Sequence, residues 1–346
     1  MRNKFRALRK QGIVETENDI NDSQEVIFRE KRITKKQIDS LIKMVGDGIR
    51  IRYKKFPLKE PPKIKYSGKG KREEVSILDL SDQHLGMVNK VFDSSVGKSV
   101  ITYNEEIFYR ELQNLQKAIF EIHEILSNSY VLRKLVILQL GDIVTNDRIF
   151  RGQQFQIEKP VGLQIEDALY YFPAFFNNLS KIYDEIEIVC VVGNHGRDTE
   201  SYQDSPVENN FEWHIYKTWQ KQFVGSKRIN VIVPDTRRYI HKIYDWKHLI
   251  EHGDSFRGSS ENYLKKQIKD IFINVGGFDM LHYGHFHSLN ESELSDKVLI
   301  KRNASWIEKD NYAFHKYKTY STPKQLFIGC SEKRVQTWHY QIDLRG

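Results

Sequence analysis

Five short polar motifs follow apolar, strand-like runs of this chain. They are Asp82-Gln83-His84, Gly141-Asp142, Gly193-Asn194-His195, His252-Gly253-Asp254 and Gly284-His285-Phe286-His287. Between the motifs, strand-like segments alternate with helix-like segments, which predicts an α/β domain of mixed β-sheets flanked by helices. The loops beyond the carboxyl ends of neighbouring strands line one crevice in such a fold, so we expect the five motifs to meet there.

The spacing of apolar residues predicts where the elements lie. Strands are expected at 74–80, 134–140, 185–192, 229–233, 239–243, 248–251 and 278–282, and helices at 104–126, 164–182, 211–223 and 262–271. Pro173 is expected to interrupt the second helix, because proline lacks the backbone N–H that the helix uses. We interpret the aromatic stretch 170–176 as a buried helix face rather than a base-stacking platform.

Charge divides the 346 residues into two parts. Residues 1–72 carry 21 Lys and Arg against 9 Asp and Glu, a formal charge of +12, whereas the remainder carries 33 against 37, or −4. Because the stretch 57–73 has the prolines, glycines and lysines of a linker, we expect a basic N-terminal region at 1–72, with a small helical nucleic-acid-binding module, and a catalytic domain at 73–346. The basic region favours nucleic acid as a partner, and a solvated lysine-rich tail is the alternative.

Cysteine content and hydropathy favour a cytoplasmic protein. Cys190 and Cys330 are the only cysteines, which excludes a disulfide framework and suits a reducing compartment. The first residues lack the apolar stretch of a secretory signal, and no run of about 18 apolar residues occurs. We therefore expect no membrane partner, and the sequence leaves open whether the chain forms a homodimer.

The motif residues are of the types that bind divalent cations. Asp82 and His84 are two residues apart, as are His285 and His287, and an extended segment directs each pair to one side. The other candidates are Asp142, Asn194, His195 and His252. This set of carboxylate, amide and imidazole groups is sufficient for two divalent cations, whose usual chemistry is hydrolysis of a phosphate ester. It also includes a group that can protonate a leaving oxygen.

The ordered motifs DxH, GD, GNH, H and GHxH resemble those of the calcineurin-like metallophosphoesterases, from about Val75 to about Asp343. The resemblance implies that family's fold and two divalent metal ions. Manganese is the expected ion, with iron, zinc and magnesium as alternatives. It further implies that the first ion binds Asp82, His84 and His287, that the second binds Asn194, His252 and His285, and that Asp142 bridges them. His195 would contact the scissile phosphate, stabilising the transition state or protonating the leaving group.

The chain departs from the family pattern after GNH, where an acidic residue is usual and this chain has Gly196 and Arg197. We therefore expect Asp198 or Asp254 to orient His195 instead. Asn146 or Asp147 is expected to supply a supporting hydrogen bond. The resemblance also implies a small-residue strand at 303–305 and a loop at 323–325.

Three arginines are candidate substrate contacts. Arg197 is placed to reach a substrate phosphate. Arg148 and Arg151 follow the Gly141-Asp142 motif, where a solvated helix start is the alternative interpretation. Six of the histidines outside the motifs are interpreted as surface or core-polar residues rather than site residues; they are His123, His214, His241, His248, His282 and His315. His282 is left out because strand alternation directs it away from His285.

The expected function is that of a metal-dependent phosphodiesterase, acting as a nuclease on DNA or RNA. The basic region favours the DNA-processing branch of the family, which includes the SbcD-type nucleases. A phosphatase or small-nucleotide phosphodiesterase is one alternative. A non-catalytic polymerase-accessory or scaffold subunit is another, although such proteins usually lose ligand residues and this chain keeps all of them.

Overall fold

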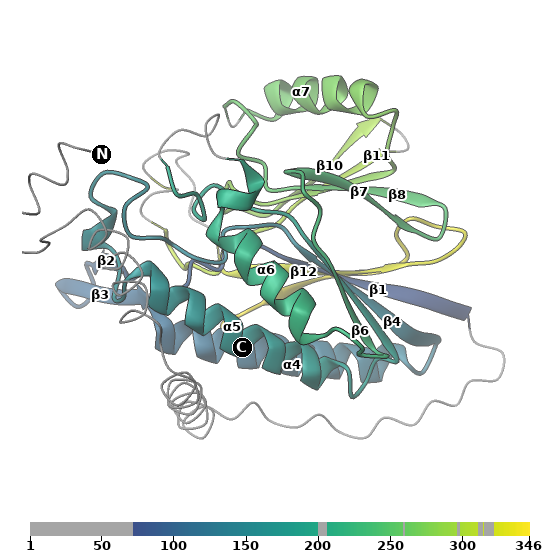
Figure 1. The fold of residues 1–346 in the computed structure, drawn as a ribbon, viewed down its shortest axis with the longest axis horizontal. Helices are drawn as coiled ribbons and strands as arrows, with labels where there is room; N and C mark the ends of the chain where they lie inside the picture. Colours follow the sequence, from purple (N-terminus) through teal and green to yellow (C-terminus); the bar gives the residue numbers. More distant parts are fainter. Residues whose placement is uncertain (1–71, 200–205, 259, 296–297, 311–313, 315–321) are drawn as a thin grey trace, which may run out of the picture. The chain divides into compact units, whose positions relative to one another are not determined.

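The computed structural model describes residues 72–199, 206–258, 260–295, 298–310, 314 and 322–346. These residues build two mixed β-sheets with helices on their outer faces (Figure 1), which confirms the predicted α/β class. Residues 1–71 of the basic N-terminal region, with the predicted helical module, lie outside the described residues, as does His315. Within the described part of the chain, no helix is both long enough and apolar enough to cross a membrane.

The first sheet contains the strands that precede three of the five motifs. Its order is β13 (His339–Asp343), β12 (Lys324–Cys330), β1 (Arg72–Leu80), β4 (Tyr130–Gln139), β5 (Glu185–Cys190) and β6 (Ile229–Ile232). Strands β1, β4, β5 and β6 are parallel, and β12 and β13 add an antiparallel edge. The near-continuous apolar runs of β1 and β4 suit this position, because parallel strands are covered on both faces.

The second sheet contains the strands that precede the other two motifs. Its order is β10 (Asn290–Ser295), β11 (Val298–Arg302), β9 (Met280–Tyr283), β8 (Trp246–Glu251) and β7 (Arg238–Ile243). Strands β8, β9 and β11 are parallel, and the edge strands β7 and β10 are antiparallel to their neighbours. The motifs therefore come from two sheets.

The two sheets pack face to face around a shared apolar core. Ile77 of β1 and Val136 of β4 belong to the same buried cluster as Ile250 of β8 and Met280 of β9. On β8 the neighbouring Leu249 belongs instead to the core under α7, as alternation along a strand requires. The sandwich thus brings the carboxyl ends of β1, β4, β5, β8 and β9 toward one region.

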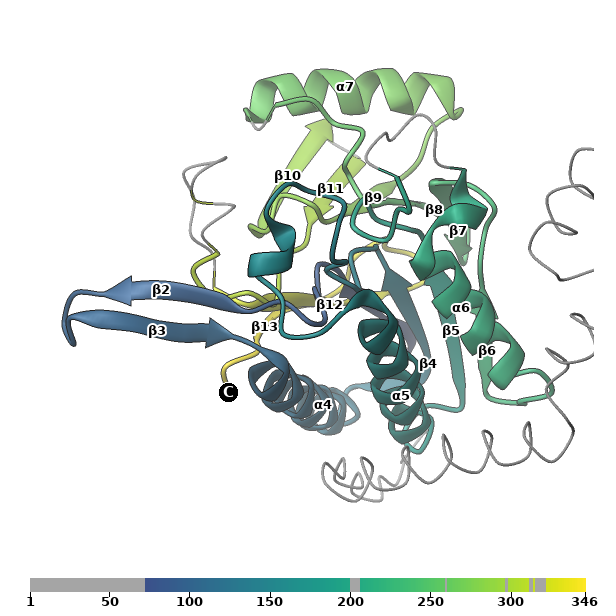
Figure 2. The same ribbon diagram turned by 60° about the vertical axis from the view of Figure 1, so that its left-hand side comes forward.

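Helices α4, α5 and α6 cover the outer face of the first sheet and α7 covers the second (Figures 1 and 2). Their bounds are α4 Glu105–Leu126, α5 Val161–Leu179, α6 Phe211–Gln222 and α7 Glu261–Asn274, with short 3₁₀ turns at Gln153–Phe155 and Val207–Asn209. The predicted break at Pro173 is wrong, since α5 is continuous through it. Phe172, Phe175 and Phe176 are fully buried around that point, and their packing outweighs one lost hydrogen bond. This burial also confirms the aromatic stretch as core.

Two further expectations about the sheets are wrong. Residues 303–305 form a buried loop after β11 rather than a strand, and Lys324 begins strand β12 where a loop was expected. The side chain of Asn303 explains the loop: its amide donates to Asp79 O at 3.1 Å and its carbonyl accepts from Leu326 N at 3.0 Å, so it joins β1 to β12. An unexpected ribbon, β2 (Asn89–Asp93) with β3 (Lys98–Tyr103), projects from the body (Figure 2).

Candidate metal centre

Motif residues from both sheets meet at the carboxyl ends of their strands. Side chains that can share a cation fall into three overlapping groups: Asp82, His84 and His287; His84, Asp142 and His195; and Asp142, His252 and His285. Within each group the candidate ligand atoms lie within 4.8 Å of one another. The structure thus brings together all the predicted His and Asp ligands, and Asn194 joins them through His252.

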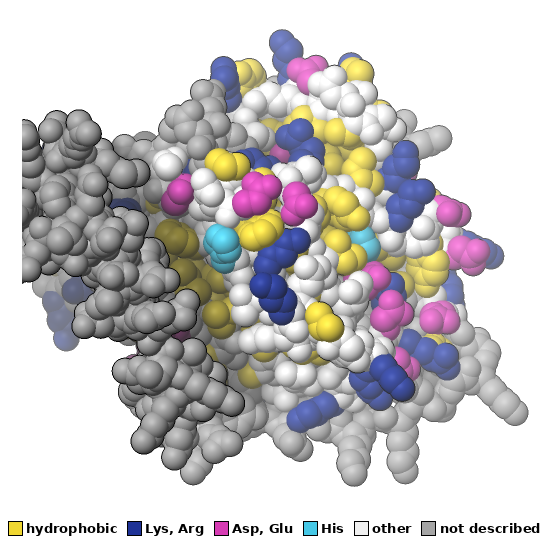
Figure 3. Space-filling model, viewed as in Figure 1, with side chains coloured by type: hydrophobic (Ala, Val, Ile, Leu, Met, Phe, Trp, Pro, Cys, Tyr) yellow, Lys and Arg dark blue, Asp and Glu magenta, His cyan; other side chains and the backbone are white. Residues whose placement is uncertain are grey.

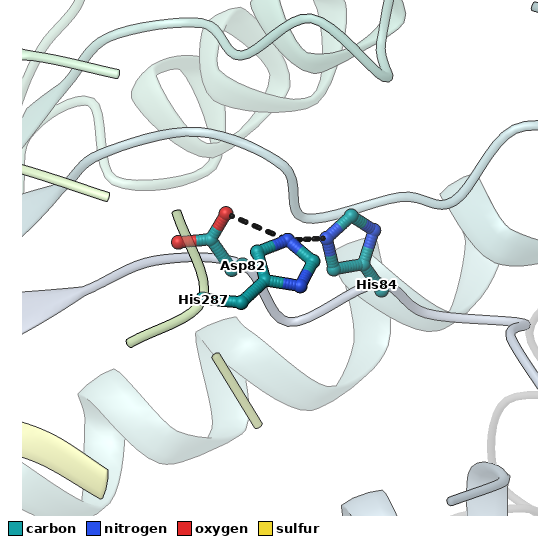
Figure 4. Close-up of side chains that lie close together, drawn as sticks. All are labelled: Asp82, His84 and His287. Carbon is teal, nitrogen blue, oxygen red and sulfur yellow. Dashed lines mark hydrogen bonds and ion pairs between the residues drawn. The ribbon is translucent and has the colours of Figure 1, made fainter. Parts of the chain in front are cut away.

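The first group combines the DxH motif with the last histidine of GHxH (Figure 4). His84 Nε2 and His287 Nε2 are 3.1 Å apart, and His287 Nε2 is 3.4 Å from Asp82 Oδ1. Asp310 accepts a hydrogen bond from His287 Nδ1, which turns Nε2 toward the other two side chains. All three are buried, so their polar atoms converge on a small volume shielded from water.

The third group combines Asp142 with His252 and His285, the histidines that follow β8 and β9. His252 Nε2 is 3.0 Å from Asp142 Oδ2 and 3.1 Å from Asn194 Oδ1. His252 Nδ1 donates to Leu140 O at 2.8 Å, which fixes the ring so that Nε2 faces the site. The rings of His252 and His285 are 5.1 Å apart in an edge-on arrangement.

Asp142 belongs to two of the three groups, one with His84 and His195 and the other with His252 and His285. Its Oδ2 is 3.0 Å from His252 Nε2 and 4.0 Å from the Nε2 atoms of both His84 and His195. Its Oδ1 accepts a hydrogen bond from His195 N at 2.8 Å, which holds the carboxylate in that orientation. The Asp142 carboxylate therefore lies between His84 and His252, as a bridging ligand would.

Two glycines permit the close approach of the motif loops. A Cβ atom on Gly193 would lie 2.1 Å from Asp142 Oδ1, and one on Gly284 would lie 2.3 Å from Asp82 Oδ2. Each glycine comes directly before a residue of the site. The close approach of the carboxylates therefore explains why glycine is the first residue of the GNH and GHxH motifs. The loops can pack against the carboxylates only because these positions lack a side chain.

Backbone strain is concentrated in the same loops. Five of the seven candidate ligands have a positive φ: Asp82 (54°), His84 (48°), Asp142 (57°), His285 (68°) and His287 (56°). Asn146 has a φ of 72°. Left-handed backbone is uncommon outside glycine, costs about 1–3 kcal/mol per residue and clusters at functional sites. The arrangement of these side chains is thus maintained against local conformational preference.

The electrostatics of the site favour added positive charge. Burial opposes a charge on His252, but Asp142 outweighs it and raises the pKa of His252 to about 10. Burial likewise disfavours a charged His287, yet Asp310 and Asp82 hold its pKa well above the usual value. Burial and the neighbouring His195 and His287 lower the pKa of His84. Carboxylates that raise the pKa of neighbouring buried imidazoles also attract divalent cations. Binding of such a cation would release the protons from those imidazoles.

The donor set fits such cations. Carboxylate oxygens, an amide oxygen and imidazole nitrogens together suit manganese, iron or zinc. His84 directs Nε2 toward His287 and Asp142, so this nitrogen is the one available to a cation. The residues present can therefore hold divalent metal.

His195 occupies the centre's partly open side. Its side chain is 17% exposed, and its Nδ1 donates to Thr145 O at 2.8 Å, with Gln153 Nε2 at 3.3 Å. The expected support from Asp198 or Asp254 is wrong, because the Thr145 carbonyl takes that role. Burial lowers the pKa of His195, while Asp142 acts in the opposite direction.

Several supporting residues were not identified from the sequence. Asp310 orients His287, and the buried carboxylate of Glu212 accepts from Gly193 N and Ile143 N, both at 2.7 Å, tying the GNH and GD loops together. Glu212 follows the α6 N-cap Asn210, a position that could have drawn attention to it. Of the two expected supports, Asn146 donates to the carbonyls of His195 and Arg197 at 2.7 and 2.8 Å. Asp147 instead accepts from Val161 N at the start of α5.

The three candidate arginines have different environments. Arg197 is buried, and its charge acts on Asp254, whose pKa is raised chiefly by burial. Arg148 has a 74% exposed side chain that pairs with Asp147 at 2.9 Å, and Arg151 is exposed nearby in sequence. Arg148 and Arg151 are therefore accessible to a ligand, whereas Arg197 is part of the packed loop.

The histidines that were left unassigned lie elsewhere. His282 faces the inter-sheet core, where Nδ1 is 2.9 Å from Asp79 Oδ2 and Nε2 is 3.0 Å from His248 Nδ1. His123 and His241 are buried, with Leu132 O and Glu187 as their respective partners, and His214 is exposed on α6. None of these belongs to the three ligand groups.

Comparison with known proteins assigns no family. No family model matches the chain, and no curated protein matches it. Among solved structures, Vps29 complexed with Zn²⁺ from Entamoeba histolytica is 10% identical, with a TM-score of 0.35 over 78% of this chain and 99% of its own. A conserved uncharacterized protein of Streptococcus pneumoniae, described as a predicted phosphoesterase, is 11% identical, with a TM-score of 0.29 over 78% of this chain and 98% of its own. The 5′-nucleotidase of Candida albicans is 9% identical, with a TM-score of 0.34 over 83% and 54%. Similarities at this level indicate neither an activity nor a family for this chain.

Proposed function

We propose that this protein is a two-metal phosphodiesterase of the calcineurin-like type that cleaves nucleic acid. The observation that carries the proposal is the position of Asp142, whose Oδ2 faces His84, His195 and His252 at the junction of the two ligand groups. A carboxylate shared between two sets of ligands, beside a partly exposed histidine, is the arrangement that phosphate-ester hydrolysis by paired cations requires.

The proposed ligands divide between two ions as the resemblance to the metallophosphoesterases implies. Asp82, His84 and His287 would hold the first ion; Asn194, His252 and His285 would hold the second; Asp142 would contact both. Bound divalent cations at such a centre make water a better nucleophile and neutralise charge on the phosphoryl oxygens. We expect Mn²⁺, because the set mixes imidazole with carboxylate and amide oxygen.

His195 is the proposed catalytic residue. Because Nδ1 donates to Thr145 O, the other ring nitrogen is left to face the site. In its protonated form that nitrogen can give a proton to the departing alkoxide. Burial lowers the pKa of His195, and Asp142 Oδ2 at 4.0 Å opposes that effect. The Thr145 carbonyl keeps the ring in this orientation, and the Gln153 amide donates to the same carbonyl.

Metal analysis combined with a substrate panel tests the activity. Protein purified with Mn²⁺ should contain about two ions per chain and should cleave labelled single-stranded DNA, duplex DNA or RNA, as well as a generic phosphate bis-ester. Turnover of a phosphomonoester alone would instead favour a phosphatase. Bound metal with no turnover of any ester would favour a non-catalytic scaffold.

Matched variants separate the site from general effects. Asp142→Asn should reduce turnover by at least about 100-fold and lower the metal content, whereas Asp270→Asn, an exposed change on α7, should alter neither. His195→Ala should lower turnover by about 10²–10⁴-fold while the metal content stays near that of the wild type, because His195 acts on the leaving group. His214→Ala is its control on the surface of α6. Full activity in either site variant would contradict the assigned roles.

We also propose that the basic region at 1–72 binds the nucleic-acid backbone. Its formal charge of +12 supports this, because lysine and arginine that neutralise phosphates release counterions. Deleting 1–72 should therefore weaken DNA binding and flatten its dependence on salt concentration. The hydrolysis of a small bis-ester serves as the control for the integrity of the catalytic domain. An unchanged salt slope would show that the region is a solvated tail.

A further inference from the structure

The loop that follows the bridging Asp142 presents aromatic and basic side chains to solvent. Phe150 is 37% exposed and Phe155 is 85% exposed. Arg148 and Arg151 are exposed in the same segment, and the stretch 148–157 contains no acidic residue. Exposed phenylalanine rings interleaved with arginines are the combination by which proteins hold unpaired nucleotides.

This loop has a defined structure in which the phenylalanines are exposed. Buried Gln153 accepts from Ile149 N at 2.8 Å and Phe150 N at 3.2 Å, and its amide donates to Thr145 O. Further along, Glu158 N donates to Gly86 O at 2.9 Å, which attaches the loop to the segment after the DxH motif. The exposure of the two rings is thus maintained by buried hydrogen bonds at both ends of the loop.

Phe150 is in direct contact with the proposed catalytic histidine. The ring centroids of Phe150 and His195 are 4.9 Å apart, with an interplanar angle of 55°. The ring of His84 contacts His195 as well, at 4.5 Å. Since His84 is buried and Phe150 is 37% exposed, Phe150 is the one of these two rings that a group from solvent can contact while it lies beside His195.

We infer that Phe150 stacks against the nucleobase on the leaving-group side of the scissile phosphate, so that the preferred substrate is a phosphodiester whose leaving nucleotide carries an unpaired base. The inference rests on the proposed phosphodiesterase function, in which His195 protonates that leaving group. Arg148 and Arg151 attract the flanking phosphates. Bases in an intact duplex are already stacked and paired, so the ring is available only to an unpaired one.

Three dinucleotide phosphodiesters with the same sugar–phosphate backbone test this assignment with the full-length, Mn²⁺-loaded protein. One carries both bases, one lacks the base on the leaving-group side and one lacks the base on the other side. Stacking on an aromatic side chain is worth about 1–3 kcal/mol, which corresponds to about a 5- to 150-fold change. We expect kcat/KM of the wild type to fall by that factor only when the leaving-side base is absent.

Variants of Phe150 distinguish stacking from a merely structural role. Phe150→Leu should remove the difference between the substrates with and without the leaving-side base, and Phe150→Trp should keep it. Phe92→Leu on the β2–β3 ribbon, where Phe92 is 65% exposed, is the matched control and should keep it too. The inference would be overturned if Phe150→Leu is slower on all three substrates but retains the wild-type ratio of kcat/KM between the substrates with and without the leaving-side base. In that case only the packing of His195 would be affected.

Equilibrium binding separates this inference from the proposed function. If no diester is hydrolysed by any of these proteins, the phosphodiesterase proposal fails on its own. The same three compounds can then be bound to the Mn²⁺-loaded protein. The stacking site would be supported if the wild type binds the compound without the leaving-side base more weakly than the complete dinucleotide and Phe150→Leu binds both equally. Equal affinity of the wild type for all three would refute it.

Discussion

Gly284→Ala should remove one metal ion while leaving the fold in place. The added Cβ would lie 2.3 Å from Asp82 Oδ2 and 2.8 Å from Ser81 Cβ. Ser81 cannot move easily, because its backbone N–H donates to buried Gln325 at 3.1 Å. The Asp82 carboxylate is the part that can rotate, and in doing so it gives up the two 3.1 Å hydrogen bonds from His285 N and its approach to His287.

The size of the effect follows from these contacts. Inserting a methyl group into a packed site costs about 1–3 kcal/mol, so the free energy of unfolding of the metal-free protein should fall by that amount. Disturbing the support of a ligand typically lowers metal affinity about 10- to 100-fold, and displacing the ligand itself should lower it at least as much. Gly193→Ala moves Asp142 instead, so it should weaken the binding of both ions.

Equilibrium dialysis with Mn²⁺ measures the change in metal affinity. Unfolding in guanidinium, followed by the fluorescence of buried tryptophans, measures the change in stability. Gly162→Ala is the control: it lies on α5 with no atom within 4 Å of the new Cβ, and alanine in a helix should raise stability by up to about 1 kcal/mol. If Gly284→Ala still binds two ions with wild-type affinity, the Asp82 carboxylate is not a metal ligand.

Three other substitutions test separate parts of the structure. Burial raises the pKa of Glu111 to about 9 from its ordinary value of 4.5. Between these two pH values the unfolded chain ionises this carboxyl group and the folded protein does not, so Glu111 lowers stability increasingly as the pH rises. Denaturant titrations should therefore show that Glu111→Gln raises the free energy of unfolding by about 3 kcal/mol at pH 7 and by little at pH 4.5. Asp310→Asn should weaken Mn²⁺ binding about 10- to 100-fold in dialysis, because it orients His287; wild-type affinity would show that this contact is dispensable. Asn146→Ala should lower kcat with little change in metal content, since its amide supports the His195 backbone; a loss of metal instead would place its role at the ligands.

The convergence of the motifs could be predicted from the sequence because it depends on local pattern. Apolar runs mark β1, β4, β5 and β9, and the polar residues that follow each run must lie at its carboxyl end. The partition of those strands between two sheets could not be predicted in the same way. Strand pairing depends on contacts between distant residues, such as Ile77 with the cluster that includes Ile250.

Edge strands were the least predictable elements. Strand β10 has the sequence NESELS, which lacks the apolar alternation of a half-buried strand, and it forms only by pairing with β11. Strand β12 contains the apolar run Leu326 to Ile328, but the resemblance to a known family suggested a loop at its start. At this position the apolar run predicts the strand better than the family resemblance does, because an apolar run requires burial whatever precedes it.

The supporting contacts of the site were hidden from sequence for a different reason. His195 is oriented by the backbone carbonyl of Thr145, and His252 by that of Leu140. Every residue has a carbonyl, so no residue type marks such a partner. A carboxylate was expected beside His195 because carboxylates are the partners that a sequence can display.

In the motif loops, hydrogen bonds between loops offset the cost of strained backbone, and this balance affects how strongly the proposed site would bind metal. The positive φ values of Asp82, His84 and Asp142 oppose folding by about 1–3 kcal/mol each. Cross-loop hydrogen bonds oppose that strain: Asp82 N donates to Gly141 O at 3.0 Å and His84 N donates to Asp142 O at 2.9 Å. Because these bonds join the loops that follow β1 and β4, neighbouring strands of the first sheet, they orient the proposed ligands without a cation. Little reorganisation is then required on binding, so most of the ion's interaction energy appears as affinity.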